Sequence, residues 1–360
     1  MKAMLLERIV SIADDPRPLT AAEVADPVPG PGDVLVAVST CGVCHTELDE
    51  IEGRTPPLRL PVVPGHQVVG RVVSVGDDVR GVAVGERVGV AWIFSACGTC
   101  ARCRAGLENL CVAFRATGRD AHGGYAELMT APAAFVHSIP AAFDDVHAAP
   151  LLCAGAIGHR ALALTGLHDG QRLGLTGFGA SGHLVLELAR ACFPGSEIFV
   201  FARGRASRAF ARELGADWVG GTEDAPPLPL HAIIDTTPAW TPVVAALAAL
   251  EPGGRLVINA IRKESTDAAR LAGLDYAEHL WMEKEIKSVA NVTRDDVRSF
   301  LEVAARSGIR SEVRTYPLDQ ANRALVELRR GGGRGAKVLR IGSSHVTPGG
   351  GSPSTGLSRR

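Results

Sequence analysis

Long apolar runs and an excess of one charge are both missing from this chain of 360 residues. No stretch approaches the roughly 20 apolar residues of a membrane-spanning helix. The first residues include Glu7 and Arg8, where a signal peptide needs an apolar segment. Lysine and arginine number 38 against 39 acidic residues, so bulk electrostatics would hold neither nucleic acid nor an anionic membrane. We therefore expect no nucleic-acid partner, no membrane partner and a cytoplasmic location.

Cysteine is also scarce, yet four of the eight cysteines are crowded into one short segment. The spacing C-x2-C-x2-C-x7-C brings together Cys97, Cys100, Cys103 and Cys111. Four thiols without a histidine in a turn-rich loop predict a closed tetrahedral site of structural zinc, in a lobe spanning residues 95–112. The alternatives are two disulfides or a loop that is merely rich in thiols. Disulfides belong mainly to small secreted domains.

The chain is long enough for two domains, and its pattern changes along its length. Residues 1–154 contain short valine-rich runs between glycine and proline turns, which is typical of a β-rich, barrel-like domain. In residues 155–290 short apolar strands alternate with helical stretches, for example a helix expected at 184–192, and this alternation predicts a parallel sheet of βαβ units. Residues 291–342 are expected to return to the first domain. The Gly/Ser/Pro-rich tail, 343–360, is expected to be disordered.

A glycine fingerprint marks the predicted nucleotide site. It reads Gly177-Phe-Gly179-Ala180-Ser181-Gly182, after an expected strand and at the start of an expected helix. Glycines let the backbone approach a pyrophosphate, and the helix N-terminus supplies N–H donors. A tight turn without a ligand is the alternative interpretation. The strand–turn–helix context favours a dinucleotide site.

The residues after the second expected strand indicate which coenzyme binds. An NAD site usually has an acidic residue about 20 positions beyond the fingerprint, where it holds the ribose 2′-hydroxyl. This chain has no carboxylate there but carries Arg203, Arg205, Ser207 and Arg208. Guanidinium groups match a 2′-phosphate, so we expect NADP(H). The alternative is a solvated basic start of a helix.

The remaining thiols and histidines are candidates for a reactive metal site. They lie in three segments: Cys41-Gly-Val-Cys44-His45-Thr46-Glu47, Pro64-Gly-His66-Gln67 and Pro150-Leu-Leu-Cys153. Two thiolates and one imidazole would leave a fourth zinc position open to water or substrate. Spacing alone does not distinguish such a site from a loop histidine and packed core thiols.

Together these motifs resemble the zinc-dependent medium-chain alcohol dehydrogenase family, and within it the cinnamyl-alcohol-dehydrogenase-like branch. The resemblance covers residues 1 to about 342 and rests on CGVCHT, PGH, the four-cysteine lobe, GGYAE at 123–127, PLLCAG and the glycine fingerprint, in that order. It implies a GroES-like β-rich catalytic domain and a Rossmann coenzyme domain, with the active site in the cleft between them. It also implies two zinc ions per chain and a homodimer or homotetramer.

Carried onto this sequence, the resemblance implies that Cys44, His66 and Cys153 hold the catalytic zinc. Thr46 takes the position of the hydroxyl that passes a proton from the alcohol. His45 takes that of a basic residue near the coenzyme pyrophosphate. Asp49 stands where the proton relay often ends in histidine, so we expect it either to substitute in the relay or to be bypassed.

Two further departures from the family concern polar groups near the metal. Gln67 replaces the glutamate of the usual Gly-His-Glu, which exchanges an anion for a neutral amide. Glu47 replaces the usual aspartate and keeps its charge. Cys41 is expected to be a packed free thiol. Apolar walls of the substrate pocket, or else ordinary core residues, are expected at Trp92, Ile93, Phe114 and Trp281.

The expected reaction is a zinc-dependent hydride transfer between NADP(H) and a primary alcohol or aldehyde, with aldehyde reduction as the working direction. One alternative is a metal-independent enone or quinone reductase. It is disfavoured because such relatives as a rule lack the cysteine and histidine ligands. A second alternative is a protein that binds nucleotide without catalysis, and only Gln67 and Asp49 point toward it.

Overall fold

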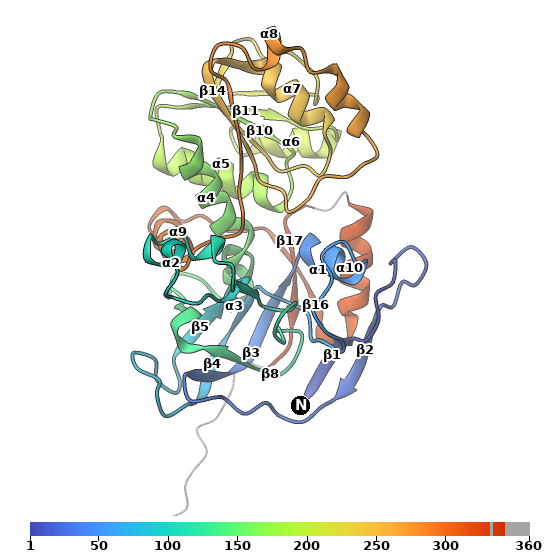
Figure 1. Cartoon of the computed structure of the whole chain (residues 1–360), viewed down its shortest axis with the longest axis vertical. Coiled ribbons are helices and arrows are strands. Elements are labelled where there is room, and N and C mark those ends of the chain that lie inside the picture. The colour runs from blue at the N-terminus through green and yellow to red at the C-terminus, as the bar shows by residue number, and fades with distance from the viewer. Residues whose placement is uncertain (332–333, 343–360) are drawn as a thin grey trace, which may run out of the picture.

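Two β-sheets form the framework of the molecule (Figure 1). The computed structural model describes residues 1–331 and 334–342, and the tail expected to be disordered, 343–360, lies outside them. The strands of one sheet come from the first part and the end of the chain, whereas the other sheet is built from its middle. The predicted combination of a β-rich part and an α/β part is therefore present.

The first sheet has seven strands, in the order β16-β17-β3-β4-β5-β9, and β8 also pairs with β3. Its strands are β3 (Asp33–Val43), β4 (Val68–Val75), β5 (Arg87–Val90), β8 (Leu128–Pro132), β9 (Val136–Ser138), β16 (Val313–Pro317) and β17 (Ala336–Arg340). In β3, the buried residues Val34, Val36 and Val38 alternate with more exposed ones. This period of two belongs to a strand with one face in the core.

Short elements complete this β-rich part. Two small sheets pair β1 (Lys2–Leu6) with β2 (Leu19–Glu23), and β6 (Ile93–Ser95) with β7 (Arg115–Ala116). The helix α1 (His45–Ile51) begins directly after Cys44. The connecting helical turns are α2 (Ala101–Arg104), η1 (Glu108–Leu110), η2 (Ala133–Phe135), α3 (Asp145–Ala148) and η3 (Ala149–Leu152).

The second sheet has six parallel strands in the order β12-β11-β10-β13-β14-β15. They are β10 (Arg172–Thr176), β11 (Glu197–Phe201), β12 (Trp218–Gly220), β13 (Leu230–Asp235), β14 (Leu250–Ile258) and β15 (Glu285–Ser288). Helix α4 (Ala154–Thr165) precedes β10. The helices between the strands are α5 (Ala180–Cys192), α6 (Arg205–Glu213), α7 (Thr241–Ala249), η4 (Ala268–Gly273) and α8 (Tyr276–His279). The strand order reverses between β10 and β13, and such sheets bind dinucleotides at this switch point.

Helix α5 begins at Ala180, earlier than the start expected at 184. Gly179 is its N-cap, so Ser181 and Gly182 lie in the first helical turn. Serine and glycine have low intrinsic helix propensity, but packing in the folded protein overrides it here. The helix N-terminus therefore lies within the fingerprint itself.

The end of the chain rejoins the first sheet. After β15 come α9 (Arg294–Ser307), β16, η5 (Leu318–Gln320), α10 (Ala321–Arg330) and β17. Strand β17 pairs antiparallel with β3, with Lys337 opposite Val43. The exact domain boundaries given above remain predictions.

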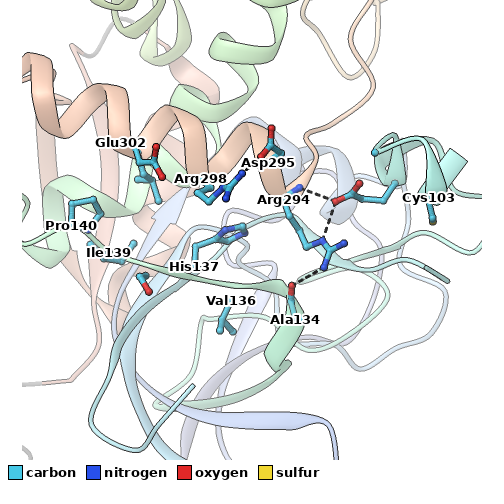
Figure 2. Close-up of a pocket in the computed structure, with 14 residues that line it drawn as sticks. Cys103, Ala134, Val136, His137, Ile139, Pro140, Arg294, Asp295, Arg298 and Glu302 are labelled. Carbon is cyan, nitrogen blue, oxygen red and sulfur yellow. Dashed lines mark hydrogen bonds and ion pairs between the residues drawn. The ribbon is translucent and has the colours of Figure 1, made fainter. Parts of the chain in front are cut away.

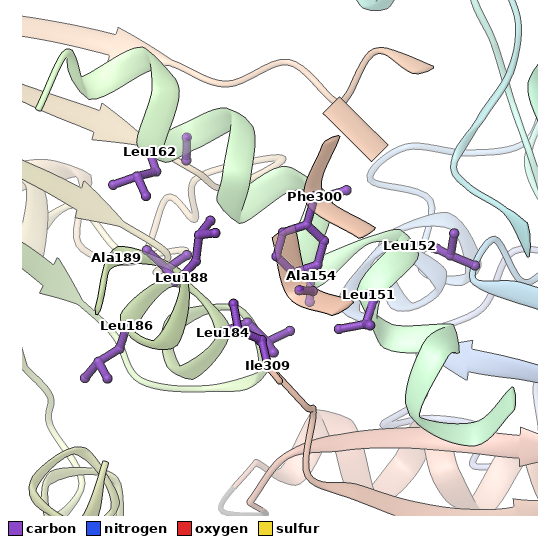
Figure 3. Close-up of a cluster of buried hydrophobic side chains, with 14 of the residues drawn as sticks. Leu151, Leu152, Ala154, Leu162, Leu184, Leu186, Leu188, Ala189, Phe300 and Ile309 are labelled. Carbon is purple, nitrogen blue, oxygen red and sulfur yellow. The ribbon is translucent and has the colours of Figure 1, made fainter. Parts of the chain in front are cut away.

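A continuous apolar core joins the two parts (Figure 3). Leu151 and Leu152, just before α4, belong to the same cluster as Leu184 of α5 and Phe300 of α9, and none of the four is more than 1% exposed. A Cβ atom on Gly155 would lie only 2.0 Å from Phe300 Cε1, so a larger residue cannot fit where α4 meets α9. Close packing of this kind transmits strain rather than absorbing it. Cys153 is thus held between Leu152 and Ala154, which belong to the tightly packed core that connects the two parts.

One segment, Asp145–Thr165, is long and apolar enough to cross a membrane by length and composition alone. It comprises α3, η3 and α4, and 61% of the tested window is buried inside the protein. Its apolar residues belong to the core that connects the two parts of the molecule, which accounts for its apolar composition.

Candidate functional site

The four cysteines of the predicted lobe converge on one point. Their sulfurs all lie within 4.8 Å of one another. Cys111 is 3.5 Å from Cys97, Cys97 is 3.8 Å from Cys103, and Cys100 is 3.9 Å from Cys111. A tetrahedral zinc with bonds of ~2.3 Å places its sulfurs about 3.8 Å apart, whereas disulfide sulfurs are about 2.05 Å apart. The thiols are free and spaced for one ion, which excludes the disulfide alternative.

Backbone N–H groups donate hydrogen bonds to these sulfurs and so favour their thiolate form. The amide of Cys100 donates to Cys97 Sγ at 3.4 Å, and that of Cys103 donates to Cys100 Sγ at 3.5 Å. Hydrogen bonds from the backbone of Thr99 and Cys100 lower the pKa of Cys97 to about 6. The thiolate is the form of cysteine that binds metals, so these hydrogen bonds favour the ligand form of Cys97.

A second cluster brings together Cys44, His66 and Cys153, whose ligand atoms also lie within 4.8 Å of one another. His66 Nε2 is 3.3 Å from Cys153 Sγ. Cys44 is the N-cap of α1, and Cys153 is the N-cap of α4. A hydrogen bond from Cys153, together with the nearby His66, holds the pKa of Cys44 well below the ordinary thiol value. Two sulfurs and one ring nitrogen fit a zinc site with its fourth position open.

Glu47 holds two of these ligand residues in place. It is completely buried, and its Oε1 lies 2.5 Å from His66 Nδ1. Its Oε2 accepts a hydrogen bond of 2.7 Å from the backbone N–H of Cys44. A carboxylate behind a ligating histidine fixes the orientation of the ring and raises its basicity. The acid that departs from the family's usual aspartate therefore supports the metal site directly.

The other predicted residues of α1 differ in their exposure. Thr46 Oγ1 lies 3.6 Å from Cys44 Sγ, beside the ligand cluster. His45 is exposed in the first turn of the helix. Asp49 is buried and is already ion-paired, because its Oδ1 accepts from Arg54 Nε at 2.6 Å and from Arg262 Nε at 2.7 Å. A relay through Asp49 would have to use its other oxygen.

Two further charged residues near the site, Glu50 and Arg262, are not indicated by any of the sequence motifs. Glu50 is 1% exposed and lies one helical turn beyond Glu47, and neither of its carboxylate oxygens has a hydrogen-bond partner among the residues the structure describes. Burial, and then the charge of Glu47, raise the pKa of Glu50 well above its usual range. Helical spacing could have indicated this residue. Arg262 could not have been found this way, because its partner Asp49 lies 213 residues away in sequence.

Aromatic side chains border the Cys44–His66–Cys153 cluster. The ring centroid of Trp92 lies 6.3 Å from that of His66 and 5.7 Å from that of Phe114. Ile93 is fully buried. Trp281 is different, because it is 55% exposed beyond the short helix α8. Of the two expected roles of Trp281, that of an ordinary core residue is wrong, since a large apolar side chain does not by itself reveal whether the fold covers it. Its role as a wall of the substrate pocket stays a prediction.

The glycine fingerprint has the geometry of a pyrophosphate-binding turn. Gly177 has φ +80°, a conformation that favours glycine. A Cβ atom on Gly182 would lie 2.7 Å from the Gly177 carbonyl oxygen, so the helix and the strand end pack closely there. A Cβ atom on Gly179 would meet nothing within 4 Å, which leaves open space at the helix N-terminus beside Ala180 and Ser181. These are the three roles that glycine plays in a dinucleotide site.

The predicted basic residues follow β11, at the carboxyl edge of the same sheet. Arg203 and Arg205 are exposed, and neither forms an ion pair within residues 1–331 and 334–342. Ser207 is half-buried. Arg208 is committed to the protein backbone, because its Nη1 donates to the carbonyls of Ala202 at 2.9 Å and Arg203 at 3.1 Å. Two of the three guanidinium groups are thus free for a ligand.

A separate cavity of about 760 Å³ lies between the four-cysteine lobe and α9 (Figure 2). Cys103 and Glu108 line one side, and Arg294 and Arg298 line the other. Arg294 crosses between these walls, pairing with Glu108 Oε1 at 3.0 Å and donating to the Ala134 carbonyl at 3.3 Å. Apart from Cys103, the residues lining it include none of the predicted site residues.

A dinucleotide-type turn at the switch point of a parallel sheet, in the same chain as a three-ligand metal cluster, indicates a metal-dependent dehydrogenase. Comparison with known proteins gives the same class. Residues 30–141 match the alcohol dehydrogenase GroES-like domain. The chain is 46% identical over 332 residues to probable alcohol dehydrogenase AdhA of Mycobacterium tuberculosis (strain CDC 1551 / Oshkosh), covering 91% of this chain and 94% of that protein. It is 33% identical to an alcohol dehydrogenase of Geobacillus stearothermophilus, covering 90% and 96%.

The fold is similar to that of a cinnamyl alcohol dehydrogenase of Sorghum bicolor, with a TM-score of 0.82, 26% identity and coverage of 94% and 97%. The chain belongs to the zinc-type medium-chain alcohol dehydrogenase family. It is thus an oxidoreductase of small alcohols or aldehydes that uses zinc and a nicotinamide coenzyme. The predicted fold class and family are confirmed, whereas the roles of individual residues remain predictions.

Replacing Glu47 by glutamine should weaken zinc binding at the three-ligand cluster by about 10–100-fold, because the imidazole loses the charge that orients it. Competition with a chromophoric chelator measures this affinity, and the four-cysteine site serves as an internal reference. Glu47→Asp keeps the charge and should stay close to wild type. Unchanged zinc affinity in Glu47→Gln would contradict this role.

Proposed function

We propose that this protein reduces aldehydes to primary alcohols with NADPH, at a zinc ion held by Cys44, His66 and Cys153. The observation that carries the proposal is the convergence of these three ligand atoms within 4.8 Å, although they come from distant parts of the sequence. A second zinc would be held by the four-cysteine lobe, which makes two per chain. The free state of all eight thiols also supports a reducing, cytoplasmic location.

Each side chain around the cluster has a task in this reaction. When bound, zinc supplies a Lewis acid that polarises the carbonyl, and the reduced nicotinamide supplies hydride. Thr46 would relay a proton to the oxygen of the product alcohol and take up another from solvent, because its hydroxyl lies beside Cys44. Glu47 keeps His66 oriented toward the two sulfurs. Trp92 covers the imidazole and helps to exclude water.

Cys44→Ser should lower the zinc content from two ions per chain to one and abolish aldehyde reduction, because a serine hydroxyl is a poor zinc ligand. Elemental analysis and steady-state assays with a panel of aldehydes measure both effects. Cys192→Ser removes an exposed thiol and should change neither. Wild-type protein with a single zinc per chain would instead support a metal-independent enone or quinone reductase.

NADP(H) preference is supported by Arg203 and Arg205, which offer two unpaired guanidinium groups next to the end of β11. Such groups bind a 2′-phosphate by charge-assisted hydrogen bonds. No acidic side chain stands in this segment to hold a ribose 2′-hydroxyl.

The Arg203→Ala/Arg205→Ala variant should raise KM for NADPH by about 10–100-fold, since a hydrogen bond to a charged group contributes about 1.5–3 kcal/mol. Its KM for NADH should stay the same. Arg212→Ala, an exposed position in the last turn of the same helix, is the matched control. A wild-type kcat/KM much higher with NADH than with NADPH would contradict the preference.

A homodimer is supported by the open edge of the six-stranded sheet. Every residue of the edge strand β15 is exposed, and Tyr276, Trp281, Met282 and Ile286 are exposed apolar residues on it or nearby in the chain. An unpaired apolar edge is unfavourable in water, and pairing with a second copy of itself would bury it.

Light scattering should therefore give at least twice the chain mass of 37.7 kDa. Ile286→Lys should shift the protein toward monomer, because a charge would be buried in the interface. A monomeric wild-type protein at micromolar concentration would argue against this assembly.

A further inference from the structure

An ion pair connects the helix of the metal site to the coenzyme-binding part. Asp49 is on α1, and Arg262 is in the loop that follows β14. Their atoms Oδ1 and Nε lie 2.7 Å apart, and the side chain of Asp49 is only 3% exposed. A charge buried to this extent requires a partner, so the contact matters to both elements.

The two ends of this pair stand at functional positions. Helix α1 carries Thr46 and begins at Cys44, so any movement of the helix moves the predicted zinc site. Arg262 lies just beyond the carboxyl end of β14, next to β13 in the half of the sheet beyond the switch point. Dinucleotides lie across this edge, with the fingerprint half on β10 and the other half toward β13 and β14. The pair therefore links the helix of the metal site to the sheet edge along which the nicotinamide half of the coenzyme would lie.

The loop that carries Arg262 is anchored firmly on the coenzyme side. The neighbouring Lys263 is paired with the fully buried Asp235 at the end of β13. It also donates to the carbonyls of Thr237 at 2.8 Å and Ala239 at 3.0 Å. The position of Arg262 is thus fixed relative to the end of β13, because its neighbour Lys263 is bound there.

On the other side, Asp49 is held independently of Arg262. Its second partner, Arg54, comes from the loop after α1 and also pairs with Glu52, which in turn pairs with Arg329 at 2.8 Å. Movement of the coenzyme-binding part away from α1 would therefore separate Asp49 from Arg262 and leave the other contacts of Asp49 intact. The remaining partner of Arg262 is Glu264 at 3.3 Å, a half-exposed side chain that contributes little.

We propose that the Arg262–Asp49 pair is a clasp that holds the two parts closed over the coenzyme, with both residues acting as positioning residues for hydride transfer. The inference rests on the proposed function and assigns Asp49 a task other than carrying a proton. The two tasks can be separated, because Arg262→Gln removes the clasp and leaves the Asp49 carboxylate in place. Asp49→Asn removes both the clasp and the carboxylate that could carry a proton.

The test compares the zinc-loaded wild-type protein with Arg262→Gln, Arg262→Lys, Asp49→Asn, the Asp49→Asn/Arg262→Gln double variant and the control Glu264→Gln. The measurements are the Kd for NADPH by fluorescence, kcat and KM for an aldehyde, and the deuterium isotope effect with NADPH labelled at C4. Thermal unfolding checks that each variant is folded.

We expect Arg262→Gln to weaken NADPH binding and to lower kcat/KM by about tenfold each, as the loss of a coupled charge pair implies. The isotope effect should rise because hydride transfer becomes slower, while the pH profile of kcat keeps its shape. Arg262→Lys should recover part of the loss. The double variant should be no worse than Asp49→Asn alone, and Glu264→Gln should match wild type.

Two results would overturn the clasp. One is wild-type behaviour of Arg262→Gln beside an impaired Asp49→Asn with an altered pH profile, which would make Asp49 a proton carrier. The other is a double variant whose losses are the product of the single losses. A wild-type protein that binds zinc and NADPH but reduces no aldehyde would contradict the proposed function instead. The Kd values of the variants for NADPH would still decide the clasp.

Discussion

The structure depends on the meeting of Cys44, His66 and Cys153 at one point. These ligands come from three separate segments of the chain, and the fold must hold each of them in place for the site to form. The β-rich sheet supplies the frame around α1 and His66, whereas Cys153 is fixed by the buried residues Leu152 and Ala154 on either side of it. Folding of the whole chain is therefore what assembles the candidate zinc site.

Helix α1 concentrates several tasks in seven residues. Its N-terminus carries Cys44, its first turn carries Thr46 and the buried Glu47, and its next turn carries Asp49. A helix repeats every 3.6 residues, so one face of α1 lies toward the metal cluster while another contacts Arg262 in the coenzyme-binding part. The short helix thus couples the chemistry at the metal to the position of the coenzyme-binding part.

Much of this site could be predicted where the signal is local. The dinucleotide turn at Gly177, Gly179 and Gly182 can be predicted from sequence because each glycine is required by the local backbone geometry of the turn. The four-cysteine lobe was readable for the same reason, since its ligands fall within one loop. The set of distant ligands, Cys44, His66 and Cys153, is predicted by the family resemblance, because their spacing in the sequence does not indicate that they meet.

What could not be predicted depends on tertiary contacts. The helix expected at 184–192 begins at Ala180 instead, because close packing at the strand end stabilises helix at Ser181 and Gly182 despite their low propensity. The alternative that Trp281 is a core residue fails because the residue follows α8 and precedes an edge strand, where no element of the described part of the chain covers it. The Asp49–Arg262 pair has no signature in sequence, because its members come from different halves of the fold.

The central claim concerns where the metal ions bind, and anomalous diffraction at the zinc absorption edge from crystals of the zinc-loaded protein tests it most directly. The account predicts two peaks per chain, one among the four sulfurs of the lobe and one bounded by Cys44, His66 and Cys153. A peak in the lobe alone, with those three side chains turned away from one another, would contradict it.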